Sequence, residues 1–508
     1  MKFFRKYMKQ PNSTQQHNHH NLISSELMAN IEKVQSIFCE TPDLVVRNFV
    51  IKSSQRRAAI IYLSGITDSQ AIYNHVLKPL LFENGNNHNE NDFRVSLGQI
   101  KESKLMYEIE SAILNGECVL FVENGTRAFI YNTPLFPKRS IEESPIESSL
   151  LGAHVGFTEA VGDNVALIRN YIHNRELKIK EITVGKRGKS KLSILYLADV
   201  VNQEVLKELE DRIKIIDVDA VMNAGALAEY IEDDPYSPFP QLLVTERPDF
   251  AASEILQGRI VTVVDRSPSV IIGPATFDSF FKTIDDYSAR WMVATFIRLM
   301  RYFGFFIAIF LPAVYIAIIS FHVDIIPLKL LLSLGESRER IPFPPYIEAF
   351  IMELTLEMLR EAGIRLPARI GQTVGIVGGI VIGQAAVEAG IVSNIMVIVV
   401  ALTAIASFII PNYEMGSAIR IIRFPMMIIA SFFGFVGIIV GFMMIIAHFI
   451  SLESLGMPYG SPFAPLSFQD WKDALIRLPQ WSIQKRPLNT GAIQLKKANP
   501  NRPEGEET

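Results

Sequence analysis

Apolar residues are unevenly distributed along this chain. In residues 1–290 they form short runs broken by polar residues, in 291–450 they are nearly continuous, and 451–508 is polar and rich in proline. A run of about 20 apolar residues is long enough to span a bilayer. The pattern therefore predicts an α/β N-terminal region followed by an all-α, polytopic transmembrane domain. A disordered polar tail is predicted for residues 1–25, and a cytoplasmic polar tail for 451–508.

The α/β region is predicted to contain two subdomains, 26–140 and 146–285, joined by a proline-punctuated linker. Each combines β-branched runs, typical of strands, with runs of helical period. Asp68 stands where its carboxylate can cap a helix. The predicted strands lie within 45–51, 58–66, 117–124, 127–132, 177–185, 190–200 and 258–274, and the clearest helix within 202–216.

The transmembrane domain is predicted to cover residues 286–450. Its predicted spans lie at about 302–321, 371–388, 392–410 and 425–448. Basic residues mark the cytoplasmic ends of membrane helices. Arg298 and Arg301 precede the first span, so this end is expected on the cytoplasmic side. Arg420 and Arg423 precede the last span.

A further helix is predicted at 346–363. It is apolar nearly all round but carries four glutamates spaced four or five residues apart: Glu348, Glu353, Glu357 and Glu361. This spacing places the carboxylates on one broad face, and Arg360 is positioned to pair with Glu357. Two interpretations stay open. The helix lies in the membrane plane with solvated glutamates, or it is re-entrant and Glu353 and Glu357 line a path for cations.

Glycines recur at every fourth position in the second span, at Gly371, Gly375, Gly379 and Gly383, and a shorter ridge follows at Gly437 and Gly441. Residues four apart share one helix face. Small residues on such a face let membrane helices approach closely. The ridges are therefore expected to pack helices, and the alternative is that they line or gate a narrow passage.

Composition narrows the function classes. The net charge of −4 over 508 residues disfavours a nucleic-acid-binding protein. The two cysteines, Cys39 and Cys118, form no CxxC motif and no disulfide framework. The N-terminus lacks the apolar segment of a signal peptide, so the N-terminal half is expected in the cytoplasm. No catalytic motif, metal site or cofactor fingerprint is found, and the protein is not expected to be an enzyme.

Charged residues also cluster at Thr245–Asp249. Glu246, Arg247 and Asp249 are interpreted as a structural ion-pair network that fixes a turn before a helix, in preference to a ligand site.

Long stretches of the chain resemble the A subunits of the GerA-type spore germinant receptors. The stretches that carry the resemblance are TERPD (245–249), EILQGRIVTVVDRSPSVIIGP (254–274), IPFPPYIEAFIMELTLEMLREAGIRLP (341–367) and the long apolar segment 374–425. The resemblance covers roughly 145–465.

The resemblance implies a multi-pass protein of the spore inner membrane. It implies a complex with a permease-like B subunit and a lipoprotein C subunit, which senses nutrients and triggers germination. It further implies a homo-oligomer that acts as a nutrient-gated cation channel within membrane lipid. A secondary transporter of small nutrients or ions is the alternative, and a membrane-tethered enzyme is the weakest hypothesis.

Overall fold

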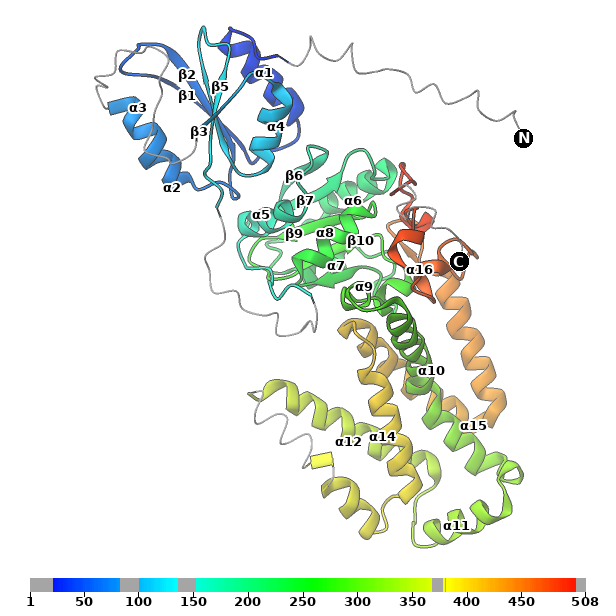
Figure 1. Cartoon of the computed structure of the whole chain (residues 1–508). Coiled ribbons are helices and arrows are strands. Elements are labelled where there is room, and N and C mark those ends of the chain that lie inside the picture. Colours follow the sequence, from blue (N-terminus) through cyan, green and yellow to red (C-terminus); the bar gives the residue numbers. More distant parts are fainter. Residues whose placement is uncertain (1–21, 83–99, 136–151, 368–377, 380, 499–508) are drawn as a thin grey trace, which may run out of the picture.

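The computed structural model describes residues 22–82, 100–135, 152–367, 378–379 and 381–498. Figure 1 shows an α/β unit, a second α/β unit with the C-terminal segment beside it, and a group of helices that extends away from the second unit. We call these parts unit 1 (22–135), unit 2 (152–290), the helical domain (291–451) and the C-terminal segment (452–498).

Unit 1 is built on a five-stranded antiparallel sheet with strand order β1-β2-β4-β5-β3. Alternate residues of β2 face opposite sides: Ala59 and Ile61 pack with α1 and α4, and Ala58 and Ile60 pack with the helical segment 69–82. Its elements are α1 (Leu27–Ile37), β1 (Leu44–Val50), β2 (Arg57–Leu63), α2 (Ser69–Ala71), η1 (Ile72–Leu77), α3 (Lys78–Phe82), β3 (Ile100–Ser103), α4 (Met106–Leu114), β4 (Cys118–Val122) and β5 (Ala128–Tyr131).

Unit 2 repeats this topology. Its sheet has the order β6-β7-β9-β10-β8, again antiparallel throughout, with α5 and α8 on one face and α6 and α7 on the other. The elements are α5 (Val161–Tyr171), β6 (Leu177–Val184), β7 (Ser190–Leu197), α6 (Gln203–Ile215), α7 (Ala224–Ile231), β8 (Leu243–Thr245), α8 (Pro248–Leu256), β9 (Ile260–Val264), β10 (Val270–Gly273), η2 (Phe277–Phe281) and α9 (Asp285–Ser288).

The local predictions for these units hold where the structure describes them. Each predicted strand stretch contains a strand, 258–274 forms the β9–β10 hairpin, and α6 lies within 202–216. The Asp68 carboxylate accepts the N–H groups of Gln70 and Ala71, as expected of a helix cap. The predicted tail ends earlier than residue 25, because Ile23 is buried and its N–H donates to the carbonyl of Lys104.

The two units are joined by polar contacts. The Arg169 guanidinium pairs with the Asp43 carboxylate through two hydrogen bonds, Nε–Oδ2 2.5 Å and Nη2–Oδ1 2.9 Å. The Tyr196 hydroxyl donates to Glu40 Oε2 at 2.7 Å, and the Glu40 carbonyl accepts from the N–H of Ile179. A two-bond guanidinium–carboxylate pair fixes orientation as well as distance, so it sets how unit 1 sits on unit 2.

The helical domain begins directly after unit 2. Its elements are α10 (Trp291–Phe321), η3 (Val323–Ile325), α11 (Leu328–Arg338), α12 (Pro345–Arg365), a short helix at 381–388, α14 (Asn394–Phe408) and α15 (Tyr413–Ser451). Within the described residues, α10 and α15 are long and apolar enough to cross a membrane.

α15 is a helical hairpin. Gly434 has φ 60° and ψ −138°, which breaks the helix into two arms. A Cβ at Gly437 would lie 2.6 Å from the carbonyl oxygen of Ile429, and a Cβ at Gly441 would lie 2.6 Å from the sulfur of Met426. In a straight helix these pairs would be far apart, at 1.5 Å of rise per residue. The predicted single span at 425–448 is therefore wrong: it contains the turn and parts of both arms.

The apolar helices alternate in direction. α10 starts at unit 2, and its end at Phe321 contacts Gly434, the turn of α15. The α14–α15 connection, Ile410–Asn412, returns to unit 2 and lines a pocket of about 390 Å³ with Lys282 and Asp285. The second arm of α15 also returns to unit 2 and continues into the C-terminal segment (Figure 1). Four antiparallel helical segments result: α10, α14 and the two arms of α15.

The glycine ridges differ in what they contact. Gly371 and Gly375 lie outside the described residues. At Gly379 an added Cβ would meet nothing within 4 Å, and at Gly383 only Val397 at 3.6 Å, so neither makes a close helix contact with another described residue. Gly437 and Gly441 do, at the α15 hairpin. A close approach that the sequence analysis missed lies at Gly304 of α10, whose Cβ would be 3.1 Å from the Ala406 carbonyl of α14.

The C-terminal segment packs on unit 2 and is not a detached polar tail. The Ser454 hydroxyl donates to the Gln241 carbonyl and accepts the Ala275 N–H, while Tyr459 and Leu455 are buried in the two cores of unit 2. Its regular elements are β11 (Glu453–Ser454), β12 (Met457–Pro458), α16 (Trp471–Ala474), η4 (Gln480–Ser482) and η5 (Leu488–Thr490).

The α15 hairpin predicts that the loss of stability caused by a glycine substitution depends strongly on where the glycine lies. Gly437→Ala should lower the free energy of unfolding by about 1–3 kcal/mol, because the new methyl group pushes the arms of α15 apart. Gly335→Ala in α11, where the methyl group meets nothing within 4 Å, is the control and should be neutral or stabilising. Thermal unfolding of the purified chain in detergent measures both. Equal melting temperatures for the two variants would contradict the hairpin.

Candidate functional site

The acidic helix α12 directs three of its four glutamates, Glu348, Glu353 and Glu357, into the helical domain. Glu348 and Glu353 are fully buried, so they are not the solvated residues of a helix lying in the membrane plane. Glu353 pairs with Arg423 of the first arm of α15. Next along the helix, Glu357 pairs with Arg420 of the same arm, Oε2 to Nε 3.3 Å. Two carboxylates one turn apart thus meet two guanidiniums that are also about one turn apart.

Arg423 also satisfies a carbonyl of a third helix. Pro312 lies inside α10 and has no N–H to give to the carbonyl of Ala308, four residues earlier. Arg423 Nε donates to that carbonyl at 2.7 Å. One side chain therefore joins α10, α12 and α15 at a point where the proline leaves a buried acceptor open. The side chains of both Arg420 and Arg423 face the protein interior.

A third pair lies at the start of α12. Glu348 Oε1 is 2.8 Å from Arg338 Nη2, and Glu348 Oε2 accepts the N–H of Ser393 at 3.0 Å. Arg338 Nη1 donates to the Tyr315 hydroxyl, which lies 3.1 Å from the Ser393 hydroxyl. The three pairs together form what we call the Glu–Arg network.

The ion-pair partner of Glu357 is Arg420 and not Arg360, the predicted one. Arg360 does not pair with it but lies over the ring of Phe408, 4.9 Å from the ring centre. A guanidinium at this distance from an aromatic face is attracted by the ring electrons. At the end of α12, Glu361 pairs with Arg365 on the surface, where both side chains are more than half exposed.

Several charged atoms of the network lack a protein partner. Among the described residues, Glu353 Oε1, Arg423 Nη2 and Arg420 Nη1 are buried and make no hydrogen bond. Buried polar atoms without partners are costly, and such atoms are normally satisfied by water or an ion. The network therefore has the chemistry of a hydrated polar site surrounded by apolar helices.

A second charged cluster ties unit 2 to α10 and to the C-terminal segment. Asp286 Oδ2 accepts from Arg298 Nη2 at 3.1 Å and from Arg301 Nη1 at 2.8 Å, and Arg298 Nη1 donates to the Asp473 carbonyl at 2.5 Å. All four side chains are largely buried. We call them the junction cluster. Arg298 and Arg301 thus hold unit 2, α10 and the C-terminal segment together.

The predicted cluster at Thr245–Asp249 lies near this junction. Arg247 Nη2 is 2.7 Å from Asp249 Oδ2 and 3.2 Å from the Ala153 carbonyl, at the start of α8. The Glu246 carbonyl accepts the N–H of Phe157. Arg247 also lines the 390 Å³ pocket beside the α14–α15 connection.

A family model described as Bacillus/Clostridium GerA spore germination protein matches residues 32–489. This chain belongs to the GerA family of spore germination proteins. It is 40% identical over 472 residues to spore germination protein KA of Bacillus subtilis (strain 168), covering 92% of this chain and 87% of that protein. It is 40% identical over 469 residues to the uncharacterized membrane protein YfkQ of the same organism, covering 92% and 91%.

Among solved structures, the crystal structure of the N-terminal domain of the A subunit of the Bacillus megaterium spore germinant receptor GerK3 is 27% identical, with a TM-score of 0.39. The similarity covers 51% of this chain and 97% of the chain in that crystal structure. The resemblance found in the sequence to GerA-type A subunits is confirmed by the family match.

In this GerA-family chain, sequence reasoning found the glutamates but missed their arginine partners. Arg423 is 70 residues from Glu353 in sequence. The spacing of the charges could have revealed the pairing. Glu353 and Glu357 are four residues apart, and Arg420 and Arg423 are three apart. Each of these two sets therefore lies on one face of a helix inside an apolar run. Matching charges on two apolar helices indicate an ion-paired interface.

The network predicts a large asymmetry between two arginine substitutions. Arg423→Met leaves the buried Glu353 carboxylate unpaired and should cost about 3–5 kcal/mol. Arg365→Gln breaks only the exposed pair with Glu361 and should cost less than about 1 kcal/mol. Thermal unfolding in detergent distinguishes the two. The double variant Glu353→Gln/Arg423→Met should recover part of the loss, and an Arg423→Met variant as stable as Arg365→Gln would overturn the assignment.

Proposed function

We propose that this GerA-family chain is the A subunit of a nutrient germinant receptor that spans the spore inner membrane. Relatives named spore germination proteins, and one relative described as a membrane protein, support this. Its partners are B (permease-like) and C (lipoprotein) subunits. α10, α14 and the two arms of α15 cross the bilayer, so units 1 and 2 and the C-terminal segment share one side, the cytoplasm. The role is signalling and not catalysis.

The chain further assembles as a homo-oligomer that conducts cations when the nutrient is sensed. The Glu–Arg network supports this part of the proposal, because carboxylates at bilayer depth are costly and are kept where they act on ions or substrates. In the present arrangement Arg420 and Arg423 neutralise Glu357 and Glu353, which corresponds to a closed path. Opening parts the arginines from the carboxylates and leaves these free to attract cations.

The junction cluster offers a route for the signal. Arg298 of α10 hydrogen-bonds both Asp286 of unit 2 and Asp473 of the C-terminal segment. A rotation of unit 2 would move the start of α10. Pro312 and Ala308 lie further along that same helix, where Arg423 is anchored, so the movement reaches the network.

A secondary transporter is the second candidate. The helix break at Gly434 and the buried charge pairs favour it, because broken helices and paired charges recur in transporter binding sites. Uptake of labelled nutrient into vesicles against its gradient would support the transporter. Cation flux without nutrient uptake would support the channel.

The ion pair Glu357–Arg420 gives the sharpest test, because its two ends have opposite predicted effects. Glu357→Gln should slow nutrient-triggered cation release severalfold, since the path loses a carboxylate. Arg420→Gln should raise cation release without nutrient severalfold, since a pair worth up to about 1 kcal/mol no longer holds the closed state. The measurement is release of monovalent cations from spores whose sole germinant receptor contains this chain with its B and C subunits.

Glu361→Gln, at the exposed pair with Arg365, is the matched control and should change neither rate. Receptor abundance is measured in each strain by immunoblot. If Glu357→Gln and Arg420→Gln both slow release at normal abundance, the pair is only structural and the channel proposal fails at this site.

A further inference from the structure

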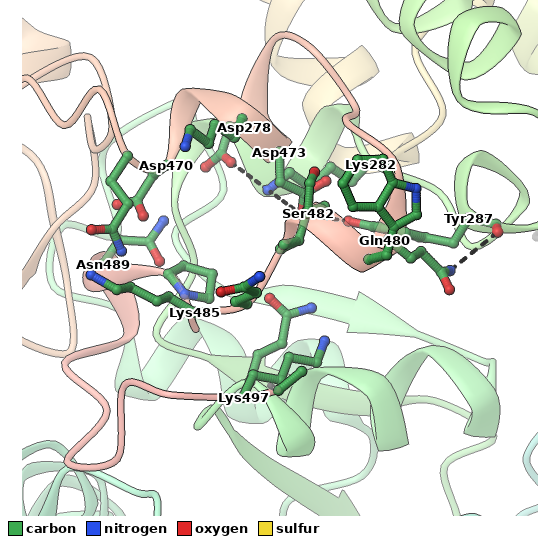
Figure 2. A pocket seen from close by; sticks show the side chains of 18 residues that line it. Asp278, Lys282, Tyr287, Asp470, Asp473, Gln480, Ser482, Lys485, Asn489 and Lys497 are labelled. Atoms are coloured by element: carbon green, nitrogen blue, oxygen red, sulfur yellow. Dashed lines mark hydrogen bonds and ion pairs between the residues drawn. The ribbon is translucent and has the colours of Figure 1, made fainter. Parts of the chain in front are cut away.

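A polar pocket of about 720 Å³ lies where the C-terminal segment meets unit 2. Figure 2 shows residues of both parts around it, among them Asp278, Lys282, Asp470, Lys485 and Asn489. Its volume is in the range of small-molecule sites. It lies apart from the Glu–Arg network, and neither the proposed receptor role nor ion conduction uses it.

The carboxylates of the pocket are already satisfied by the protein. Asp278 pairs with Lys282 at 2.7 Å and accepts the Thr276 hydroxyl at 2.6 Å. Burial opposes its ionisation, but the Lys282 ammonium and these hydrogen bonds outweigh burial and hold the pKa of Asp278 below its usual value. The negative charge of Asp278 is therefore already neutralised by Lys282 and does not require a cationic ligand.

The other two carboxylates are also held. Asp473 accepts the Tyr287 hydroxyl at 2.8 Å and lies 3.3 Å from Arg298 Nη1. Asp470 accepts the Ser467 hydroxyl at 2.9 Å and the N–H of Leu488 at 3.3 Å. Neither carboxylate needs a ligand to complete its hydrogen bonds.

The charged side chains of the pocket that lack a counter-charge in the described part of the chain are lysines. Lys472, Lys485 and Lys497 line it and form no ion pair with any residue in the described part of the chain. Ammonium groups gathered at one cavity attract an anion. The pocket therefore favours a negatively charged ligand.

Asn489 adds a specific requirement. Its side chain is only 6% exposed, and its Nδ2 donates to the Thr276 hydroxyl oxygen at 3.1 Å. The Thr276 hydroxyl gives its own hydrogen to Asp278, so it must accept from Asn489, which fixes the orientation of the amide. Asn489 Oδ1 is buried and has no hydrogen-bond partner among the described residues. This acceptor calls for a ligand with a hydrogen-bond donor.

We infer that this pocket binds a small organic anion that carries a hydroxyl group. Its anionic group contacts the lysines, and its hydroxyl donates to Asn489 Oδ1. Soluble polyol phosphates have this chemistry, and so does the headgroup of a phosphatidylglycerol lipid. The lipid source is within reach, because Trp481 lines the pocket, is half exposed, and follows Arg477, whose N–H bonds Thr295 near the apolar start of α10.

The test uses the full-length chain purified in detergent without anionic lipid. sn-Glycerol 3-phosphate is titrated while tryptophan fluorescence is recorded, with Trp481→Phe identifying the signal of the pocket. We expect saturable binding. Glycerol, which lacks the charge, and sulfate, which lacks the hydroxyl, should bind at least tenfold more weakly.

Variants assign the binding to these residues. Lys485→Gln/Lys497→Gln should weaken binding at least tenfold, and Lys496→Gln, an exposed neighbour outside the pocket, should leave it unchanged. Asn489→Leu should abolish the preference for sn-glycerol 3-phosphate over sulfate. Circular dichroism and melting temperature verify that each variant folds.

A second arm separates the two sources. The chain is placed in nanodiscs of phosphatidylcholine with or without phosphatidylglycerol. If phosphatidylglycerol alone blocks sn-glycerol 3-phosphate, the lipid headgroup is the ligand, and if it does not, a soluble anion is. Absence of saturable binding in both arms, or binding that the lysine and asparagine variants leave unchanged, overturns the inference. Since no ion flux is measured, this outcome is independent of the channel proposal.

Discussion

A buried guanidinium has to find partners on every side, and Arg423 does so by drawing three helices together. Glu353 of α12 gives it a counter-charge, and the Ala308 carbonyl, left open by Pro312, gives it an acceptor on α10. Removing any one of these leaves the others unsatisfied in an apolar surrounding. Together with the pairs Glu357–Arg420 and Glu348–Arg338, this side chain and the proline that prepares its site fix the position of α12 against the rest of the helical domain.

The same chemistry recurs where the helices leave unit 2. Arg298 and Arg301 of α10 are fixed by Asp286, and the C-terminal segment closes over them through Asp473. Charged contacts of this kind hold direction as well as distance. The first turns of α10 are thus rigidly attached to the α/β part, and the middle of the same helix carries the Glu–Arg network. The junction cluster and the Glu–Arg network are therefore connected by one continuous helix, α10.

Local pattern predicted most of the strands and helices of units 1 and 2, since alternation and capping are encoded within a few residues, as at Asp68. The shared strand order of the two sheets was not predicted, because pairing between distant strands leaves no local trace. The break at Gly434 was hidden for another reason: the residues on both sides are equally apolar. The glutamates of the candidate site were found from their spacing, but Arg423 was not recognised as the partner of Glu353, because charge alone does not report which way a side chain faces.

The core of unit 2 includes residues that follow the helical domain in sequence: Leu452, Leu455, Tyr459 and Ala492. During synthesis the ribosome finishes unit 2 long before it reaches them. Nascent unit 2 accordingly emerges with uncovered apolar surface, and the helical domain must be synthesised before that surface is sealed. The α/β part is thereby completed only after translation has passed Ala492, so a chain truncated before that residue would be left open to proteolysis.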